Sequence, residues 1–348
     1  MREKVTERLV AGDSGKLAED GAIRRAAELL RAGGTVAFPT ETVYGLGANA
    51  LDAAAVAKVF EAKQRPAWDP LIVHVSDRAM LEQVAEIPAS VEGLLEAFWP
   101  GPMTLLLPKK AAVPDAVTAG RRLVGVRMPR HRVALALIAA AGVPIAAPSA
   151  NLFGKTSPTT AEHVLSDLDG RIDAVLDGGS TSVDVESTVL DACVEPIVLY
   201  RPGAVTAEQI AEVTGRAVQV FERSAEAALP ESLPSPGVGL RHYAPRARLL
   251  LVEGADVKEL QQRLAELALS LRVEGKIGVM LPTGWSSGSD STFAWGDWQD
   301  GESLARRLFA GMRYLDEEGV TVILCPMPTG GGIGAALRDR LGKAARVE

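Results

Sequence analysis

The stretch at 33–50, GGTVAFPTETVYGLGANA, constrains the fold of this chain more than any other. Its residues 35–38 predict a short buried strand, and Pro39 ends that strand because proline donates no backbone hydrogen bond to a sheet. The TET at 40–42 then supplies two hydroxyls and a carboxylate. Ligands of open α/β sheets bind at the carboxyl ends of strands. The stretch therefore predicts an α/β sheet with a binding site at this edge, and an ordinary strand-to-helix loop is the alternative.

Apolar strands alternate with amphipathic helices along the rest of the chain, which is typical of α/β folds. A length of 348 residues exceeds one typical hydrophobic core. Proline, glycine and serine dominate at 223–245, where SPGVGLRHYAP has too many breakers for regular structure. We therefore expect a first α/β domain at 17–221, a linker at 222–246 and a smaller parallel α/β domain at 247–348.

The composition predicts a cytoplasmic protein. The sequence has neither a signal-peptide pattern nor an apolar run near the roughly 20 residues of a membrane span. Its two cysteines, Cys193 and Cys325, are far apart in apolar runs, so we expect two buried thiols and neither a disulfide nor a zinc site.

The charge is unevenly distributed. A net charge of -7 argues against binding nucleic acid by broad phosphate neutralisation. Between Asp115 and Glu162, however, the chain carries six basic residues and no acidic one. This segment predicts a local anion site, with a solvated basic face as the alternative.

A second polar loop, SANLFGKTS at 149–157, follows another short predicted strand. Thr159 and Glu162 are spaced as a capping box, so the loop leads into a helix N-terminus, whose free N–H groups favour phosphate. It is not a Walker loop, because Ser149 stands where that motif requires glycine. The GLGANA at 45–50 is also a weak dinucleotide fingerprint, since it begins six residues past its strand.

Polar and cationic side chains gather at the predicted strand ends and helix starts of the first domain. They are Thr40, Lys63, Arg65, His74, Arg127, Ser149, Asn151, Ser157, Ser187 and Arg201. No Ser-His-Asp order, carboxylate pair or metal-ligand spacing accompanies them, so neither covalent catalysis nor a protein-held metal is predicted. Positioning and charge stabilisation remain, and these suit attack on a phosphate.

Several motifs resemble, in order, the YrdC family of threonylcarbamoyl-AMP synthases. They are GGTVAFPTETVYGLGANA, KQRP, DPLIVHV, FWPGPMTLLL, VGVRMPRH, PIAAPSANLFGKTSPTTAEHV, ESTVLD and YRPGAV. The paired family signature, Lys-x-Arg and Ser-x-Asn, is met by Lys63, Arg65, Ser149 and Asn151. SPGVGLRHYAP and the domain after it are similar to the longer members. The resemblance implies a YrdC-like twisted mixed sheet with helices, followed by a Rossmann-like parallel α/β domain.

The resemblance also implies the reaction. Members condense L-threonine, bicarbonate and ATP into threonylcarbamoyl-AMP and release pyrophosphate, the first step of tRNA threonylcarbamoyladenosine modification next to the anticodon. Mg²⁺ would arrive with ATP, without a protein metal site. The product would pass to the tRNA threonylcarbamoyl transferase complex, and any tRNA binding by this acidic chain would be weak.

The resemblance assigns roles to individual residues. L-threonine would be bound by Thr40, His74, Arg127, Ala147 and Ser187, with Arg127 pairing the carboxylate. ATP would be bound by Lys63, Ala67, Ser149, Asn151, Ser157, Arg201 and Tyr243, and Lys63 and Arg65 would be catalytic. The chain departs from its relatives at Leu123, where Thr is frequent, and at Asp184, where glycine is common.

Two alternatives stand beside this interpretation. A carbamoyl-phosphate-dependent carbamoyltransferase of the hydrogenase-maturation type carries a related domain, but with cysteine-rich zinc fingers that two cysteines cannot build. An RNA-binding regulatory module without catalysis would use the basic segment, although the overall acidity opposes it.

Overall fold

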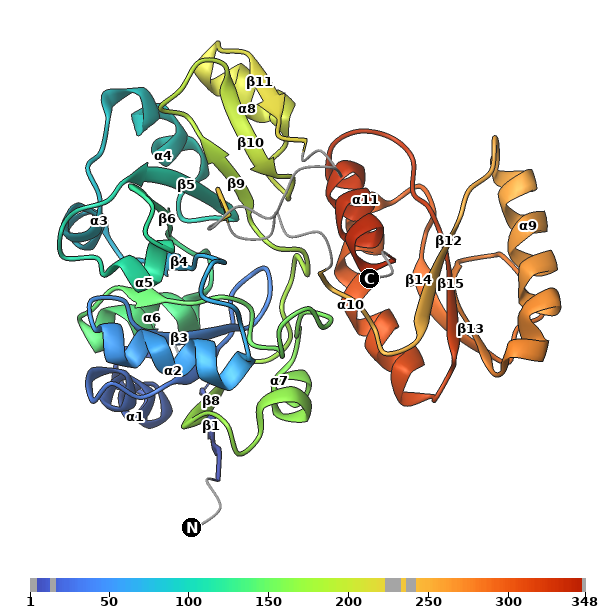
Figure 1. The fold of residues 1–348 in the computed structure, drawn as a ribbon, viewed down its shortest axis with the longest axis horizontal. Helices are drawn as coiled ribbons and strands as arrows, with labels where there is room; N and C mark the ends of the chain where they lie inside the picture. Colours follow the sequence, from blue (N-terminus) through green and yellow to red (C-terminus); the bar gives the residue numbers. More distant parts are fainter. Residues whose placement is uncertain (1–4, 13–16, 223–232, 236–241, 346–348) are drawn as a thin grey trace. The chain divides into compact units, whose positions relative to one another are not determined.

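The computed structural model describes residues 5–12, 17–222, 233–235 and 242–345 (Figure 1). The chain divides into two compact units. The first comprises Met1–Phe153, Pro158–Ser182 and Glu186–Gly239, and the second comprises Gly154–Ser157, Val183–Val185 and Leu240–Glu348. The predicted linker at 222–246 falls largely outside the described residues.

Eight α-helices surround the sheet in the described part of the first unit. They are α1 (Gly21–Arg31), α2 (Ala53–Lys63), α3 (Arg78–Val84), α4 (Glu92–Phe98), α5 (Asp115–Thr118), α6 (Arg132–Ala141), α7 (Ala161–Leu168) and α8 (Ala207–Thr214). Asp52 caps α2, because its side chain accepts hydrogen bonds from two N–H groups at the start of the helix. The predicted cap at Thr159 is wrong, because Thr160 caps α7 and Thr159 Oγ1 lies 3.3 Å from His163 Nδ1 instead.

One mixed sheet forms the core of the first unit, in the order β1-β8-β2-β3-β7-β4-β6-β5-β9-β10-β11. The strands are β1 (Glu7–Val10), β2 (Val36–Phe38), β3 (Gly45–Asn49), β4 (Ile72–His74), β5 (Met103–Pro108), β6 (Leu123–Arg127), β7 (Ile145–Ala146), β8 (Ala174–Asp177), β9 (Thr188–Asp191), β10 (Ile197–Arg201) and β11 (Val218–Val220). The sheet contains both parallel and antiparallel pairs, which confirms the mixed sheet implied by the resemblance.

The GLGANA segment forms β3, an antiparallel partner of β2. Two of its glycines lie close to neighbouring side chains, and the space at Gly47 is too small for a Cβ. A Cβ at Gly47 would lie 2.6 Å from Ile145 Cγ2 and 2.8 Å from Phe38 Cε1, and one at Gly45 would lie 3.3 Å from Ala147 Cβ. The glycines therefore allow close strand packing, and they do not form a turn over a pyrophosphate.

The second unit is a four-stranded sheet in the order β12-β15-β13-β14, and all of its strand pairs are parallel. Its elements are β12 (Arg248–Val252), α9 (Val257–Ser270), β13 (Ile277–Pro282), β14 (Ser291–Gly296), α10 (Gly301–Glu317), β15 (Val322–Pro326) and α11 (Ile333–Ala344). Strand and helix alternate as expected for a Rossmann-like domain. Only β14 was not expected from the sequence.

The two cysteines differ in their exposure to solvent. Cys325 is buried in β15, as predicted, whereas Cys193 is exposed just after β9, so its predicted burial is wrong. Within the described residues, no helix combines the length and the apolar character needed to cross a membrane.

Candidate active site

The predicted site residues of the first unit lie near the ends of strands that do not all run in the same direction. Because the sheet is mixed, β4 and β6 run opposite to β2 and β7. His74 ends β4 and is the register partner of Arg127, which ends β6. The His74 ring meets Phe38 of β2 edge-on at 5.8 Å. His74 and Arg127 therefore share the carboxyl edge of two parallel strands, as predicted, and side-chain contacts join them to β2 and the loop after it.

Arg127 joins three segments of the first unit. Its Nη1 donates to Thr42 Oγ1 at 2.9 Å, and its Nε donates to the Gly101 carbonyl at 3.3 Å. Its Nη2 lies 2.7 Å from Glu41 Oε2, in an ion pair whose side chains are 4% and 2% exposed. Burial favours a neutral Glu41, but the Arg127 charge outweighs it and lowers the pKa of that carboxyl. The pair is therefore ionised.

His74 is neutral beside this pair. Burial, and then the charge of Arg127, lowers the pKa of His74 to about 3. Its Nδ1 has no hydrogen-bond partner within the described residues. The neutral imidazole can therefore donate one hydrogen bond to a polar ligand group or accept one from it, without adding a charge to the site.

Thr40 folds the loop after β2 around its own hydroxyl. Its Oγ1 donates to the Val43 carbonyl at 2.7 Å and accepts from the N–H groups of Thr42 and Val43. This side-chain-to-backbone pattern is typical of Ser and Thr turns. Ala147 lies buried just after β7, where its N–H donates to the Ile72 carbonyl at 2.8 Å.

Ser187 and Arg201 contact each other directly. Arg201 Nε donates to the Ser187 carbonyl at 2.9 Å, and Nη2 donates to Ser187 Oγ at 3.1 Å. Ser187 Oγ also lies 2.7 Å from Thr104 Oγ1, a residue that sequence reasoning did not select. A residue predicted for threonine and one predicted for ATP thus form one buried cluster.

Lys63 ties the Lys-x-Arg segment to the Ser-x-Asn loop. Its Nζ donates to the Ser149 carbonyl at 2.6 Å and also to the Asn151 carbonyl. The residue is 1% exposed at the end of α2. Burial and the Arg65 charge lower the pKa of Lys63 well below its usual value, while the carbonyl acceptors favour the ammonium form. The sequence predicts that the two segments belong to the site, but it does not predict the contact between Lys63 and the two loop carbonyls.

Arg65 orders its own turn. Its Nη2 lies 2.9 Å from Asp69 Oδ1 and also donates to the Pro70 carbonyl, and its Nε donates to the Asp69 carbonyl. The Arg65 guanidinium lies 5.8 Å from the centre of the Phe153 ring. Ala67, in the same turn, is exposed. The observed contacts of Arg65 are those of a residue that holds the 65–70 turn, and its predicted catalytic role stays a prediction.

Ser157 and Tyr243 belong to the second unit. Arg313 of α10 donates from Nη2 to the Thr156 carbonyl at 2.5 Å and from Nε to the Ser157 carbonyl at 3.4 Å. The Tyr243 ring stacks on Phe309 at 5.7 Å. Asp184, also in this unit, has φ of 59°, a left-handed conformation that glycine adopts more readily than other residues.

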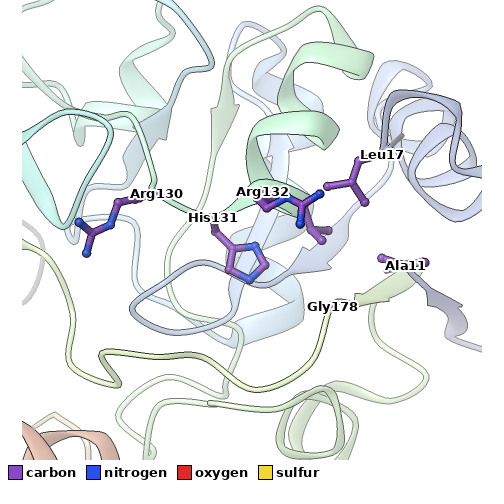
Figure 2. Close-up of a pocket in the computed structure, with 8 residues that line it drawn as sticks. Ala11, Leu17, Arg130, His131, Arg132 and Gly178 are labelled. Carbon is purple, nitrogen blue, oxygen red and sulfur yellow. The ribbon is translucent and has the colours of Figure 1, made fainter. Parts of the chain in front are cut away.

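A cavity of about 380 Å³ opens beside the start of α6 (Figure 2). Its charged lining is Arg130, His131 and Arg132, all from the basic segment. Burial lowers the pKa of His131, so its ring is largely neutral at pH 7. None of the ATP or threonine residues predicted above lines this cavity, and no group of three or more potential metal ligands occurs within the described ranges.

Two family models match the chain. The Sua5/YciO/YrdC model, described as "Telomere recombination", matches residues 28–203, and a model described as "Threonylcarbamoyl-AMP synthase, C-terminal domain" matches residues 205–346. The chain therefore belongs to the Sua5/YciO/YrdC family, in its longer two-domain form, which confirms the resemblance seen in the motifs.

Individual relatives match the sequence of this chain over nearly its full length. The chain is 46% identical to a threonylcarbamoyl-AMP synthase of Pyrococcus abyssi over 94% of this chain and 95% of that protein. It is 45% identical to a synthase of the same name from Bacillus subtilis, over 94% and 93%. A crystal structure of P. abyssi Sua5 complexed with L-threonine matches with a TM-score of 0.89 and 43% identity, over 98% of this chain and 97% of that one.

Proposed function

We propose that this protein is an L-threonylcarbamoyladenylate synthase, which makes threonylcarbamoyl-AMP and pyrophosphate from L-threonine, bicarbonate and ATP. The observation that carries the proposal is the match of both units to relatives that bear this name, one of them solved with L-threonine. Three buried cationic side chains of the first unit, Lys63, Arg127 and Arg201, support it, because all three substrates carry negatively charged groups.

The proposed reaction has two steps, formation of a carbamate and its transfer to AMP. The threonine nitrogen first bonds to the bicarbonate carbon, which gives a carbamate and releases water and a proton. A carbamate oxygen then attacks the α-phosphorus of ATP, and the bond from that phosphorus to the oxygen bridging the β-phosphorus breaks. Pyrophosphate leaves with that electron pair. No covalent enzyme intermediate is needed, so orientation and charge stabilisation supply the catalysis.

Residues of the chain have distinct tasks in this scheme. Arg127 would bind the threonine carboxylate, with Thr40, His74, Ala147 and Ser187 around it. Lys63 would hold the Ser149–Asn151 segment in place for ATP through the two carbonyls that it contacts. Asn151, Ala67 and Arg201 would complete the nucleotide contacts of the first unit, and Arg65 would support the phosphates.

Magnesium would enter as part of the substrate. Mg²⁺ prefers phosphate oxygens and water, and it commonly binds through one or two protein groups only. We infer that the ion travels on the triphosphate, and that the product passes in the cytoplasm to the enzymes that modify tRNA.

Pyrophosphate release tests the proposal. The purified protein should release pyrophosphate from ATP and Mg²⁺ only when L-threonine and bicarbonate are both present. Release without any amino acid would favour a carbamoyltransferase. No release under any combination would favour the RNA-binding alternative, which a tRNA-binding assay at modest salt then tests.

A further inference from the structure

Glu41 is a buried carboxylate whose hydrogen-bonding capacity is not filled. Its side chain is 2% exposed, and Arg127 and the backbone of Arg130 lie near enough to lower its pKa, yet neither carboxylate oxygen meets a well-aligned donor within the described residues. Buried polar atoms are nearly always hydrogen-bonded, because leaving them without a partner is costly. The carboxylate can therefore accept a further hydrogen bond from a ligand.

Arg127, beside Glu41, has a nitrogen that lacks a well-aligned hydrogen-bond acceptor. Two of its nitrogens, Nη1 and Nε, donate to Thr42 and Gly101, but Nη2 makes no hydrogen bond among the described residues. Its 2.7 Å separation from Glu41 Oε2 is close enough for an ion pair, yet the N–H groups are not aligned with that oxygen. A donor and an acceptor that both need partners thus lie side by side.

The ligand that satisfies both must carry a cationic donor and an anionic acceptor close together. An α-amino acid has this arrangement, since one carbon atom separates its ammonium from its carboxylate. His74 adds a neutral, unpaired Nδ1 within the electrostatic influence of both Glu41 and Arg127. An uncharged ring nitrogen suits a side-chain hydroxyl.

We propose that Glu41 binds the ammonium group of the substrate amino acid, next to Arg127, which takes its carboxylate. This inference rests on the proposed function and adds a specificity-determining residue to it. Glu41 fixes the substrate nitrogen, the atom that must bond to the bicarbonate carbon, and it selects against acids that lack an amino group.

A purely structural role predicts a different behaviour. If Glu41 only held Arg127 in place, its removal would weaken every ligand that uses Arg127, with or without an amino group. The two roles are therefore separated by a ligand that lacks the nitrogen. The compound (R)-3-hydroxybutyrate is L-threonine without its amino group.

The experiment measures the affinities of both compounds for the full-length protein by calorimetry, or by competition in the pyrophosphate assay. In Glu41→Gln, L-threonine should bind roughly 10- to 100-fold more weakly, the range of a lost charge-assisted hydrogen bond. The affinity for (R)-3-hydroxybutyrate should change by less than about threefold, which is within the scatter of a neutral substitution. Glu41→Asp, which keeps the charge, should recover part of the threonine affinity.

Glu61→Gln, at an exposed position on α2, is the matched control and should leave both affinities unchanged. Unchanged threonine affinity in Glu41→Gln, or an equal loss for both compounds, would overturn the inference. Circular dichroism and thermal melting establish that the variants are folded. Failure of the wild-type protein to release pyrophosphate with threonine and bicarbonate would instead refute the proposed function, so the two failures are distinguishable.

Discussion

Lys63 Nζ lies 2.6 Å from the carbonyl oxygen of Ser149, so the two halves of the Lys-x-Arg and Ser-x-Asn signature are joined through a side chain and a backbone. A second bond reaches the carbonyl of Asn151. The lysine thereby fixes the course of the loop that follows β7. This arrangement gives the signature a physical reason: the ammonium satisfies carbonyls that a loop cannot pair within itself.

Replacing Lys63 by alanine should remove most synthesis. Both loop carbonyls lose their donor and the site loses a buried cation, so we expect kcat/KM to fall by about 100-fold or more, as when one preorganised donor is removed from an active site. Lys58→Ala is the matched control, because Lys58 lies on the same helix and donates to the Gly33 carbonyl at 2.7 Å. Steady-state pyrophosphate release measures kcat/KM for both variants. Near-normal turnover by the Lys63→Ala variant would show that Lys63 has no role in the mechanism.

Arg201→Ala should impair the use of threonine as well as ATP. Its guanidinium holds both the carbonyl and the hydroxyl of Ser187, so its loss frees a predicted threonine contact. We expect the KM for L-threonine to rise roughly tenfold, the effect of a charged hydrogen bond. Arg216→Ala removes an arginine that also bonds two backbone carbonyls, away from the predicted site residues, and should leave that KM unchanged. A change in the KM for ATP alone would contradict the link through Ser187.

His74→Gln should alter the dependence of stability on pH. The pKa of His74 is about 3 in the folded protein and near 6.5 when unfolded. Below pH 6.5 the unfolded chain gains a proton that the folded chain does not, so the stability from this residue is complete above pH 6.5 and declines as the pH falls.

The charged neighbours of His74 are Glu41 and Arg127. Relative to His74→Gln, the wild-type protein should lose about 1.4 kcal/mol of unfolding free energy per pH unit between pH 6 and pH 4. Urea unfolding at several pH values measures this. Parallel curves for the two proteins would show that His74 is not held neutral.

Gly47→Ala should destabilise the first unit. Its new methyl group would lie 2.6 Å from Ile145 Cγ2 and 2.8 Å from Phe38 Cε1, both in a packed core. Overpacking of this kind costs about 1–3 kcal/mol, which thermal melting detects. Gly21→Ala is the control, because a Cβ at that position meets nothing within 4 Å. Equal stability of the two variants would show that the core relaxes around the methyl group.

The sequence predicted the alternation of strands and helices and the parallel second domain, because amphipathic periodicity and capping residues such as Asp52 and Thr206 act locally. It did not predict β3 or β1. Gly45 and Gly47 are poor strand formers, and they pair in β3 only because Phe38 and Ile145 occupy the space that their side chains would need. β1 depends on β8, more than 160 residues away, for its pairing.

The site was predictable as a set of residues but not as a set of contacts. Lys63, Ser149 and Arg127 were selected from motifs, yet the bonds of Lys63 run to backbone carbonyls, which carry no sequence signal. The pairing of Arg127 with Glu41 depends on strand directions in a mixed sheet, and local sequence does not set these. Thr104 was missed for the same reason, since only the fold places it beside Ser187.

Transfer of labelled bicarbonate tests the central claim most directly. The wild-type protein is incubated with ATP, Mg²⁺, L-threonine and ¹³C-bicarbonate, and the products are separated rapidly and analysed by mass spectrometry. We expect a threonylcarbamoyl-AMP that carries one ¹³C atom and forms in step with pyrophosphate. Pyrophosphate that appears without this labelled adenylate, or an adenylate without the label, would contradict it.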